Sequence, residues 1–459
     1  MDSLSKKSAI SSLFERPDSL GALLPYDDYL PSYQVFQMKD GSLGTVFEVD
    51  LLEHEPMTER QIIRAVESIK NWFSLKENCV LQILFDSSYY SPYDKNIMEL
   101  GNGFGKQHPV AKLLHSEKVK HIKENCLKHK ESSPLKRTLL VSVRYFLEKE
   151  SEVKLRDLGN SKELLSRSVF ALKSELDKFL HIIKEFKENS ELSIKNLNDE
   201  TVVEKLRQFF NPKSSFKRNF APLNKNLPIS EQLIFSTPKL DFPGMECEGI
   251  KSRVLTLKTS PSYAYPGGMA YFVNLNFPFR IAINISFPSS QSVKKFLGAK
   301  EFFLENAATA KARVQKEEIN HIQERLARDD RVLHMTFCII VDGETEEILE
   351  ERSRMISHIF HNHLECEVIE ETDIGLGLWM NSLPLNYSPE SDFSTRRAIR
   401  ILRSDCKNFI PLFDSFKGFD QAIGIYLSRE NNLVPFSLLE NETSNHTVVL
   451  ADTGAGKSA

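Results

Sequence analysis

The residues whose types and spacing most clearly suggest chemistry form a glycine-rich loop at 451–458, with the sequence A-D-T-G-A-G-K-S. The loop matches the Walker A pattern of phosphate-binding loops, except that alanine replaces the usual first glycine. Gly454 and Gly456 permit backbone conformations that let successive N–H groups curve around phosphate oxygens. Lys457 would place an ammonium group on the β- and γ-phosphates, and Ser458 would offer a hydroxyl to Mg²⁺.

The sequence therefore predicts that ATP and Mg²⁺ bind at this loop, with the metal contacted by Ser458. The short apolar segment 447–450 predicts the strand that must lead into such a loop. The predicted nucleotide-binding residues are Thr453, Gly454, Ala455, Gly456, Lys457 and Ser458.

Hydrolysis of ATP needs more than this loop. A working site also requires the helix after the loop, an acidic strand for Mg²⁺ and a group that positions water. The sequence ends at Ala459. We therefore expect no catalytic residue within this chain, no hydrolysis by the chain as given, and a partial or truncated sequence.

Two other clusters carry residue types suited to chemistry. His358, His361, His363 and Cys366 are all metal-ligand types, but their spacing is irregular and straddles a predicted helix end. Histidines near a helix C-terminus are favourable through the helix dipole alone, which disfavours a metal site. The glycine-rich segment 101–106 ends in lysine, but no predicted strand precedes it, which favours a surface loop.

Length and composition limit the class of protein. A chain of 459 residues predicts two or three domains, and 41% apolar with 27% charged residues is a normal globular balance. The net charge of −4 argues against a dominant nucleic-acid-binding surface. Six scattered cysteines favour a reducing compartment. No segment has the length and apolarity of a membrane span, so membrane association is expected through protein partners.

Residues 1–25 are predicted to be a mobile N-terminal arm, and 26–240 a first α+β unit for docking and assembly. Thr58 and Gln61 form a possible capping box at the start of a helix. The stripe of apolar residues over 165–186 is compatible with a coiled coil, although packing on a sheet is favoured. This unit is expected to place its helices on one face of a mostly antiparallel sheet. Its predicted strands are 47–51, 80–85 and 139–145, and its predicted helices are 62–73, 165–186 and 202–209.

The segment 211–243, rich in Pro, Asn, Lys and Ser, is expected to be a linker or an extended excursion. A second α+β unit is predicted at 241–430, and the start of a RecA-like P-loop domain at 431–459. Apolar segments on either side of Asn431 and Asn432 predict two strands joined by a turn. The second unit's predicted strands are 254–257, 281–287, 332–341 and 365–370, with one or two helices over 290–328 and another over 344–360.

Several segments resemble the TraC-type conjugative transfer ATPases, the VirB-class ATPases of type IV secretion systems. The segment 445–458 resembles the entry to their motor domain. Upstream, the similar segments are L-P-Y-D-D-Y at 24–29, D-G-S-L-G at 40–44, F-F-N-P at 209–212 and L-P-L at 383–385 with Arg397 after it.

This resemblance implies a cytoplasmic, oligomeric and usually hexameric motor that is peripheral on the inner membrane through protein partners. Its N-terminal region would dock on inner-membrane components of the secretion channel, and its RecA-like domain would power pilus assembly and transfer of DNA or protein. Of the family's functional residues, only the phosphate-loop positions carry over, most securely Gly456, Lys457 and Ser458.

Two alternatives stay open at this point. The region before the loop could act as a non-catalytic docking or scaffold module that binds channel components and associates with itself. A DNA-pumping ATPase of the coupling-protein or FtsK kind is disfavoured, because such proteins generally carry N-terminal membrane spans and this sequence has none.

Overall fold

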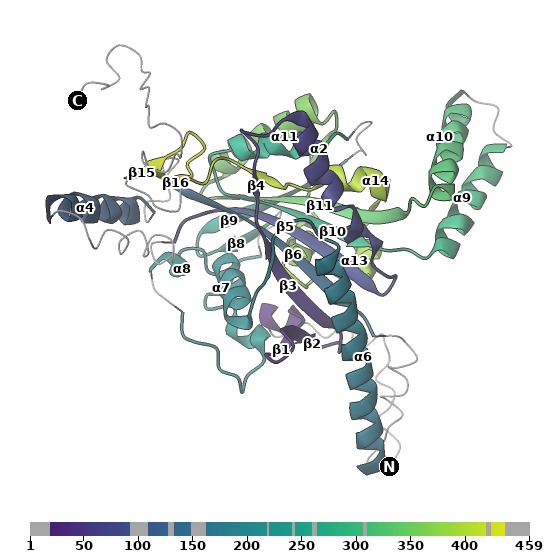
Figure 1. Ribbon diagram of the computed structural model, residues 1–459, viewed down its shortest axis with the longest axis horizontal. Helices are drawn as coiled ribbons and strands as arrows, with labels where there is room; N and C mark the ends of the chain where they lie inside the picture. Colours follow the sequence, from purple (N-terminus) through teal and green to yellow (C-terminus); the bar gives the residue numbers. More distant parts are fainter. Residues whose placement is uncertain are drawn as a thin grey trace.

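A computed structural model describes residues 19–91, 109–126, 133–147, 162–217, 220–240, 244–258, 264–305, 310–418 and 424–436. These residues form a mixed α/β structure around one large sheet (Figure 1). The predicted mostly antiparallel α+β architecture is confirmed for this part of the chain. The predicted P-loop strand and the loop itself lie outside the described residues.

The sheet has 12 strands, all of whose pairings are antiparallel. Along its main path the order is β1 (Tyr26–Leu30), β2 (Val35–Met38), β3 (Leu43–Val49), β6 (Leu135–Tyr145), β5 (Cys79–Tyr89), β10 (Phe279–Ser286), β11 (Val332–Gly343), β9 (Ile250–Leu257) and β12 (Val368–Glu370). Off this path, β7 (Ile194–Asn196), β8 (Met245–Cys247) and β13 (Ile399–Leu402) pair with β3, β9 and β11.

Strands from both predicted units lie in this sheet. β5 and β10 are neighbours, with Val80 opposite Ser286 at one end and Ser87 opposite Phe279 at the other. The sheet is therefore continuous across the predicted boundary near residue 240. The functional division into a docking unit and a second unit stays a prediction.

The half-buried pattern predicted at 47–51 is confirmed, since Phe47, Val49 and Leu51 are buried and Asp50 is exposed. The central strands β5 and β6 differ, because they are buried on both faces. In β5 and β6, residues of both parities are closed off from solvent. Because successive side chains of a strand point to opposite faces, helices must cover the sheet on both sides.

The first face is covered by the long helix α6 (Lys162–Glu188), by α2 (Glu59–Ser68) and by α11 (Glu346–His363). The predicted capping box is confirmed, since the amide of Thr58 donates to Gln61 Oε1 at 2.8 Å. Phe179 of α6 stacks on Tyr145 of the sheet at 5.8 Å between ring centroids. The described side chains of α6 thus pack on the sheet, as predicted.

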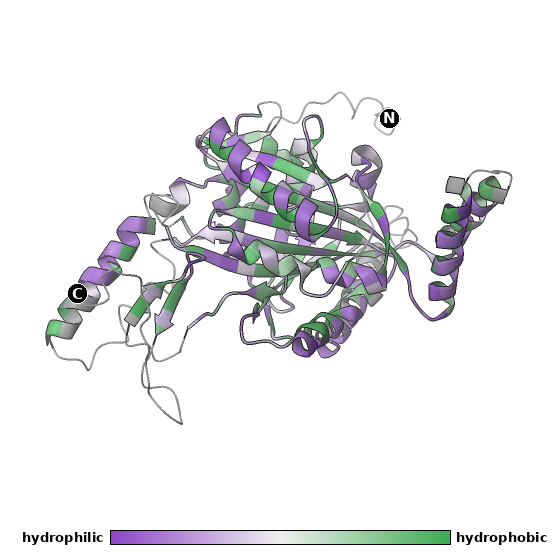
Figure 2. Ribbon diagram, turned by 90° about the horizontal axis from the view of Figure 1, so that it is seen from above, coloured by the Kyte–Doolittle hydropathy of each residue, from purple (hydrophilic) through white to green (hydrophobic). Residues whose placement is uncertain are grey.

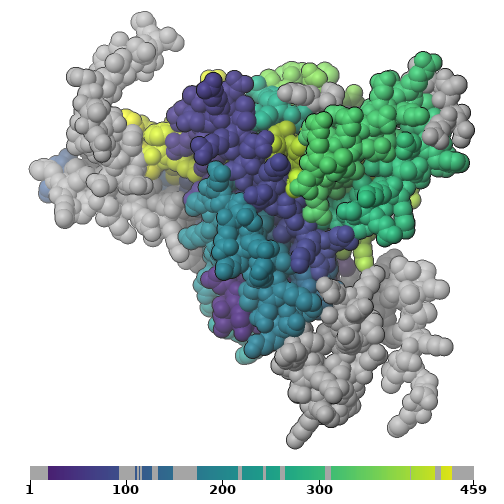
Figure 3. Space-filling model, turned by 45° about the vertical axis from the view of Figure 1, so that its right-hand side comes forward, coloured from purple at the N-terminus to yellow at the C-terminus, as the bar shows by residue number. Residues whose placement is uncertain are grey.

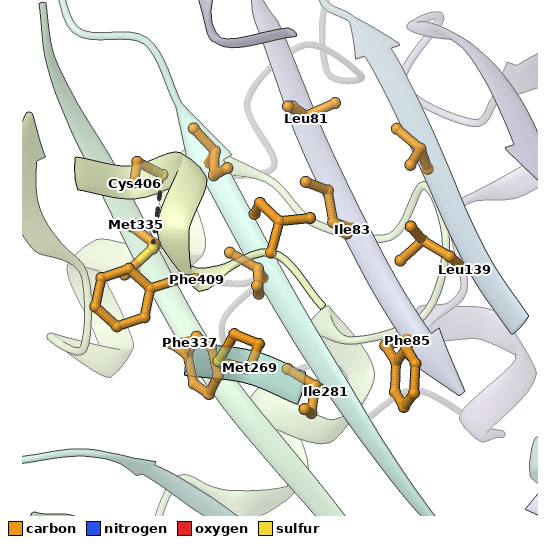
Figure 4. Close-up of a cluster of buried hydrophobic side chains, with 14 of the residues drawn as sticks. Leu81, Ile83, Phe85, Leu139, Met269, Ile281, Met335, Phe337, Cys406 and Phe409 are labelled. Atoms are coloured by element: carbon orange, nitrogen blue, oxygen red, sulfur yellow. Dashed lines mark hydrogen bonds between the residues drawn. The ribbon is translucent and has the colours of Figure 1, made fainter. Parts of the chain in front are cut away.

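The centre of this first core is apolar and continuous across the strands (Figure 4). Leu81, Ile83 and Phe85 of β5 face the same side as Ile281 and Phe337 of the neighbouring strands. Figure 2 shows hydrophobic residues along the strands, while the helices carry hydrophilic residues as well.

The second face carries α7 (Asp199–Phe210), the 3-10 turn η3 (Ile229–Gln232) and α12 (Gly375–Asn381). The prediction that the helices of the first unit lie on one face is therefore wrong. Val202 and Leu206 of α7 pack with Leu84 and Leu140, which point away from α6. The physical reason is that the sheet strands are apolar on both sides, so a single helical layer would leave one face in water.

The described residues of the predicted linker or excursion, 211–217 and 220–240, form an excursion that packs on this second face. The side chain of Asn211 is fully buried and donates to the carbonyl of Leu233 at 2.8 Å, while its oxygen accepts the amide of Phe235 at 2.8 Å. Ile229 and Leu233 belong to the second core. The Asn211 side chain thus satisfies backbone groups at both Leu233 and Phe235 that no regular structure satisfies.

A helical hairpin stands out from the body. The single or double helix predicted over 290–328 is two helices, α9 (Ser290–Glu305) and α10 (Ala310–Ala327), which project beside the sheet (Figures 1 and 3). Phe302 and Phe303 are 64% and 75% exposed near the end of α9. Among the helices that the structure describes, none combines the length and apolarity needed to cross a membrane.

The segment 381–387 crosses the second face of the sheet and is held through its backbone carbonyls. Gln82 Nε2 donates to the carbonyls of Asn381 and Leu383 at 3.0 and 3.2 Å. Arg144 Nη1 donates to the carbonyls of Leu385 and Tyr387 at 3.0 and 3.3 Å. Since this backbone makes no strand ladder, these buried side chains satisfy its acceptors.

Gly44 of β3 lies in close contact with this segment. A Cβ atom at Gly44 would lie 2.7 Å from Leu385 Cδ2. Leu385 is fully buried and has φ of +64°, so its side chain has little freedom to move away.

We expect Gly44→Ala to lower the free energy of unfolding by about 1–3 kcal/mol, through overpacking against Leu385. Urea denaturation followed by circular dichroism measures the change. Gly298→Ala in α9 is the matched control, because no atom lies within 4 Å of its Cβ position, and it should stabilise by about 0.5–1 kcal/mol. An unchanged stability for Gly44→Ala would contradict the close packing described for this segment.

Candidate functional site

All predicted nucleotide-binding residues, Thr453 to Ser458, lie outside the described residues, as does the predicted strand 447–450. The nearest described element is the two-stranded hairpin of β15 (Gly424–Leu427) and β16 (Leu433–Phe436). The structure therefore shows how the part of the chain that leads toward the loop is attached to the sheet.

The hairpin confirms the two strands and the turn predicted around Asn431 and Asn432. Leu427 pairs with Leu433, and the amide of Ser428 donates to the carbonyl of Asn432 at 2.9 Å. Asn431 has φ of +62°, a conformation that asparagine tolerates better than most residues. Asn431 and Asn432 are both buried, so the turn packs against the body of the protein.

Arg137 of β6 holds this turn. Its side chain is fully buried. Nη1 donates to Asn432 Oδ1 at 2.6 Å, and Nη2 donates to the carbonyl of Glu430 at 3.0 Å. Nη2 also donates to the carbonyls of Val273 and Leu275, at 2.9 and 3.1 Å. One guanidinium thus joins the sheet, the hairpin turn and the end of η4 (Gly268–Asn274).

A buried carboxylate balances the charge of this arginine. Asp414 Oδ1 lies 3.4 Å from Arg137 Nη1 and accepts a hydrogen bond from Asn432 Nδ2 at 3.2 Å. Burial lowers the pKa of Arg137, and the neighbouring Asp414 carboxylate opposes that change. Because arginine has a very high ordinary pKa, the group stays charged and forms a buried ion pair.

Backbone and apolar contacts reinforce the attachment. The amide of Leu135 donates to the carbonyl of Asn431 at 2.8 Å, which continues the end of β6 onto the turn. A small core beside the hairpin includes Ile425 and Leu433 with Val119 of helix α4 (Pro109–Cys126). The hairpin is thereby fixed on two sides.

Segments that were distant in the sequence meet on the second face of the sheet. Tyr26 of the 24–29 segment donates its hydroxyl to the carbonyl of Pro384 at 2.6 Å. Arg144 Nη2 donates to Asp40 Oδ2 at 2.6 Å, which ties the 40–44 segment to the same place. Beside them, Phe210 contacts Trp379 at 5.3 Å between ring centroids. Four of the segments that carried the family resemblance therefore form one packed region.

Arg397 also belongs to the segments that resemble the family, but it lies apart from this packed region and forms an ion pair. It pairs with Glu371 of the buried region beside β9, with Nε 2.5 Å from Oε1 and Nη2 donating to Oε2 at 3.0 Å. Glu371 also accepts the hydroxyl of Thr256. The contacts among Arg397, Glu371 and Thr256 hold the chain after β12 against β9. We read them as structural contacts.

The cluster of His358, His361, His363 and Cys366 does not assemble into a metal site. Among the described residues no group of three or more His, Cys, Asp or Glu side chains could hold a metal ion. His363 instead stacks on Tyr271 at 3.8 Å between centroids, and Cys366 lies in the first core. The glycine-rich segment 101–106 lies outside the described residues.

Sequence reasoning missed Arg137, Arg144 and Gln82. For Gln82 and Arg144 the available signal was their position, since each interrupts an otherwise apolar run that predicts a buried strand, whereas Arg137 stands between Lys136 and Thr138 and carries no such signal. Charged or amide groups at such positions are rarely buried without hydrogen-bonded partners. Their partners lie far away in the sequence and could not be named in advance.

Comparison with known proteins gives one family. A family model described as TraC protein matches residues 20–387, well over half of the chain. A search of the curated proteins gave no match.

The attachment of the hairpin can be tested at Arg137. We expect Arg137→Met to lower the free energy of unfolding by roughly 3–5 kcal/mol, because it leaves Asp414 buried without its positive partner. Hydrogen exchange should also quicken at the amides of β15 and β16, whose turn loses its anchor. Urea denaturation and exchange followed by mass spectrometry measure the two effects.

Two further variants make the result specific. Lys136→Met removes the same charge from the neighbouring position of β6 and should leave exchange in the hairpin unchanged. Adding Asp414→Asn to Arg137→Met should recover part of the lost stability, since no unpaired charge then stays buried. Hairpin amides that exchange at the original rate in Arg137→Met would rule out the anchoring role.

Proposed function

The chain belongs to the TraC family of conjugative transfer proteins, and from this premise we propose that it acts as an ATP-binding motor of a type IV secretion system. Residues 431–459 would open its RecA-like domain. The observation that carries the proposal is the loop at 451–458, with Gly456, Lys457 and Ser458 in the order that a phosphate-binding loop requires.

In this proposal the loop binds ATP with Mg²⁺. Lys457 neutralises the phosphates, and Ser458 contacts the metal. The helix that follows would direct its positive end at the same phosphates. The sheet-based region before the loop would transmit the nucleotide state to partners, with the Arg137 anchor as its mechanical connection.

The partners we propose are inner-membrane components of the secretion channel and further copies of the chain, with a hexamer as the working assembly. The protein would be cytoplasmic and peripheral on the inner membrane through those partners, and would energise pilus assembly and transfer of DNA or protein. Direct DNA binding is not part of the proposal, because the net charge of −4 offers no basic surface excess.

One structural feature favours a second candidate function, a docking module. The hairpin of α9 and α10 projects from the body (Figure 3). Phe303 on α9 is 75% exposed. Exposed apolar side chains on a projecting element are typical of surfaces that bind other proteins. Under this alternative, nucleotide binding at Lys457 would be dispensable.

The two functions separate at Lys457. We expect Lys457→Ala to weaken binding of a fluorescent ATP analogue by at least about tenfold, because a charge-assisted contact to phosphate is lost. In the native conjugative system the same variant should abolish transfer while the protein still assembles with its partners. Transfer at the normal rate would favour the docking function and contradict the motor.

Lys106→Ala is the matched control for nucleotide binding. It removes a lysine from the other glycine-rich segment, 101–106, which the sequence predicts to be a surface loop. ATP affinity should stay unchanged in this variant. A loss equal to that of Lys457→Ala would show that the effect reflects overall charge rather than the phosphate loop.

A further inference from the structure

A cavity with a volume of about 260 Å³ lies where the α9–α10 hairpin meets the sheet. Its walls come from both helices of the hairpin and from the paired strands β11 and β13. A cavity of about 150 Å³ holds one benzene molecule, so by the same proportion this space admits a molecule of about ten non-hydrogen atoms. Its lining residues are separate from those of the Arg137 anchor.

Most of the cavity wall is apolar. The hairpin supplies Val293, Leu297, Ile319 and Ile322, and β13 supplies Leu402. Such a wall favours the apolar part of a ligand, because that part leaves water when it binds. Mostly apolar cavities with a few polar groups are the usual form of small-molecule sites.

The charged groups of the wall are positive in excess. Its titratable side chains are Lys300, Glu318, His334 and Arg400. In the described part of the chain, none of the four forms an ion pair with another side chain. Burial and the Arg400 cation lower the pKa of His334, so this imidazole is neutral at neutral pH. Two positive charges, on Lys300 and Arg400, therefore face one negative charge, on Glu318.

Charged residues directly next to the lining residues in the sequence do not cancel this excess. Four are positive and two are negative: Lys294, Lys295, Arg331 and Arg403 against Glu301 and Glu317. The surroundings of the cavity therefore favour an anion over a cation or a neutral ligand.

Arg400 is the group best placed to hold that anion. It is exposed, and it lies on β13 directly opposite His334 of β11. Its guanidinium carbon lies over the ring of Phe296 of α9, at 3.8 Å from the centroid. The ring contacts the face of the guanidinium, whereas the five N–H donors lie in its plane. The stacking thus fixes the group and leaves its donors open to an acceptor.

His334 supplies a second donor beside the first. Directly opposite residues of an antiparallel pair share one face of the sheet, with Cβ atoms about 4.5–5.5 Å apart. A neutral imidazole carries one N–H donor. The two oxygens of one carboxylate can therefore accept from Arg400 and His334 together, and their charge offsets that of the arginine.

Combining these donors with the apolar wall, we propose that the cavity binds a small organic carboxylate, with its oxygens on Arg400 and His334 and its apolar part between the hairpin and the sheet. Val293 and Ile319 contact the apolar part from α9 and α10. This binding is independent of the nucleotide proposed at residues 451–458. It joins the projecting hairpin to the sheet through a ligand.

Octanoate is the probe that tests this site, by isothermal titration calorimetry on the full chain. We expect saturable binding at one site. Arg400→Gln should raise the dissociation constant at least about tenfold, since glutamine lacks the charge and the planar fork that binds a carboxylate. Ser292→Trp should weaken binding to a similar degree, because Ser292 is an exposed part of the wall and an indole there would fill the space.

Arg313→Gln is the matched control, because it removes the same charge from an exposed arginine of α10 that does not line the cavity. It should bind octanoate as the original chain does. 1-Octanol, which has the same carbon chain without a charge, should bind at least about tenfold more weakly than octanoate. Thermal melts confirm that each variant is folded. Absence of saturable binding, or equal affinity in Arg400→Gln or for 1-octanol, would overturn the proposal.

Hydrogen exchange followed by mass spectrometry locates the ligand. Octanoate should slow exchange at the amides of α9 and α10, because the bound molecule contacts both helices and the sheet. The amides of β15 and β16, which lie outside the cavity wall, should exchange at the original rate. Binding that leaves exchange in the hairpin unchanged would place octanoate elsewhere and contradict the proposed site.

Discussion

The structure depends on one requirement, that buried peptide carbonyls find donors. The segment 381–387 crosses an apolar sheet face without joining its ladder, so its carbonyls must be satisfied by side chains. Gln82, Arg144 and Tyr26 supply those donors from three different strands. Their geometry fixes the distance between segment and sheet, and at that distance a Cβ atom at position 44 would lie 2.7 Å from Leu385 Cδ2.

The same requirement operates at the other end of β6. Arg137 and Arg144 have opposite parity in the strand, so they point to opposite faces of the sheet. On the second face, Arg144 donates hydrogen bonds to the 381–387 segment. On the first face, Arg137 donates hydrogen bonds to the turn before β16. A single strand therefore connects the region matched by the family with the hairpin that leads toward residue 437. Displacement of either attachment would leave buried guanidinium N–H groups without their acceptors, which makes independent movement costly.

Regular elements could largely be predicted from the sequence, because their signals are local. The apolar run at 80–85 and the capping box at Thr58 each lie within one element, and both are confirmed. The arrangement of layers could not be predicted in the same way. A strand such as β6 shows apolar residues of both parities, but the sequence does not say that α7 covers one side and α6 the other.

The contacts of the buried polar side chains were harder still to predict from the sequence, since each contact joins residues far apart in the chain. Arg137 and Asn432 are separated by 295 positions, and the sequence at either one carries no sign of the other. The same limit applied to 211–243, where composition suggested a possible linker. The buried side chain of Asn211 binds the backbone of Leu233 and Phe235 and helps to hold the described part of this irregular segment against the core. The candidate phosphate loop is the opposite case, because its signal is entirely local. The family match at 20–387 ends before that loop, so the match supports the fold and the conjugative context, while the proposed nucleotide chemistry depends on residues 451–458 alone.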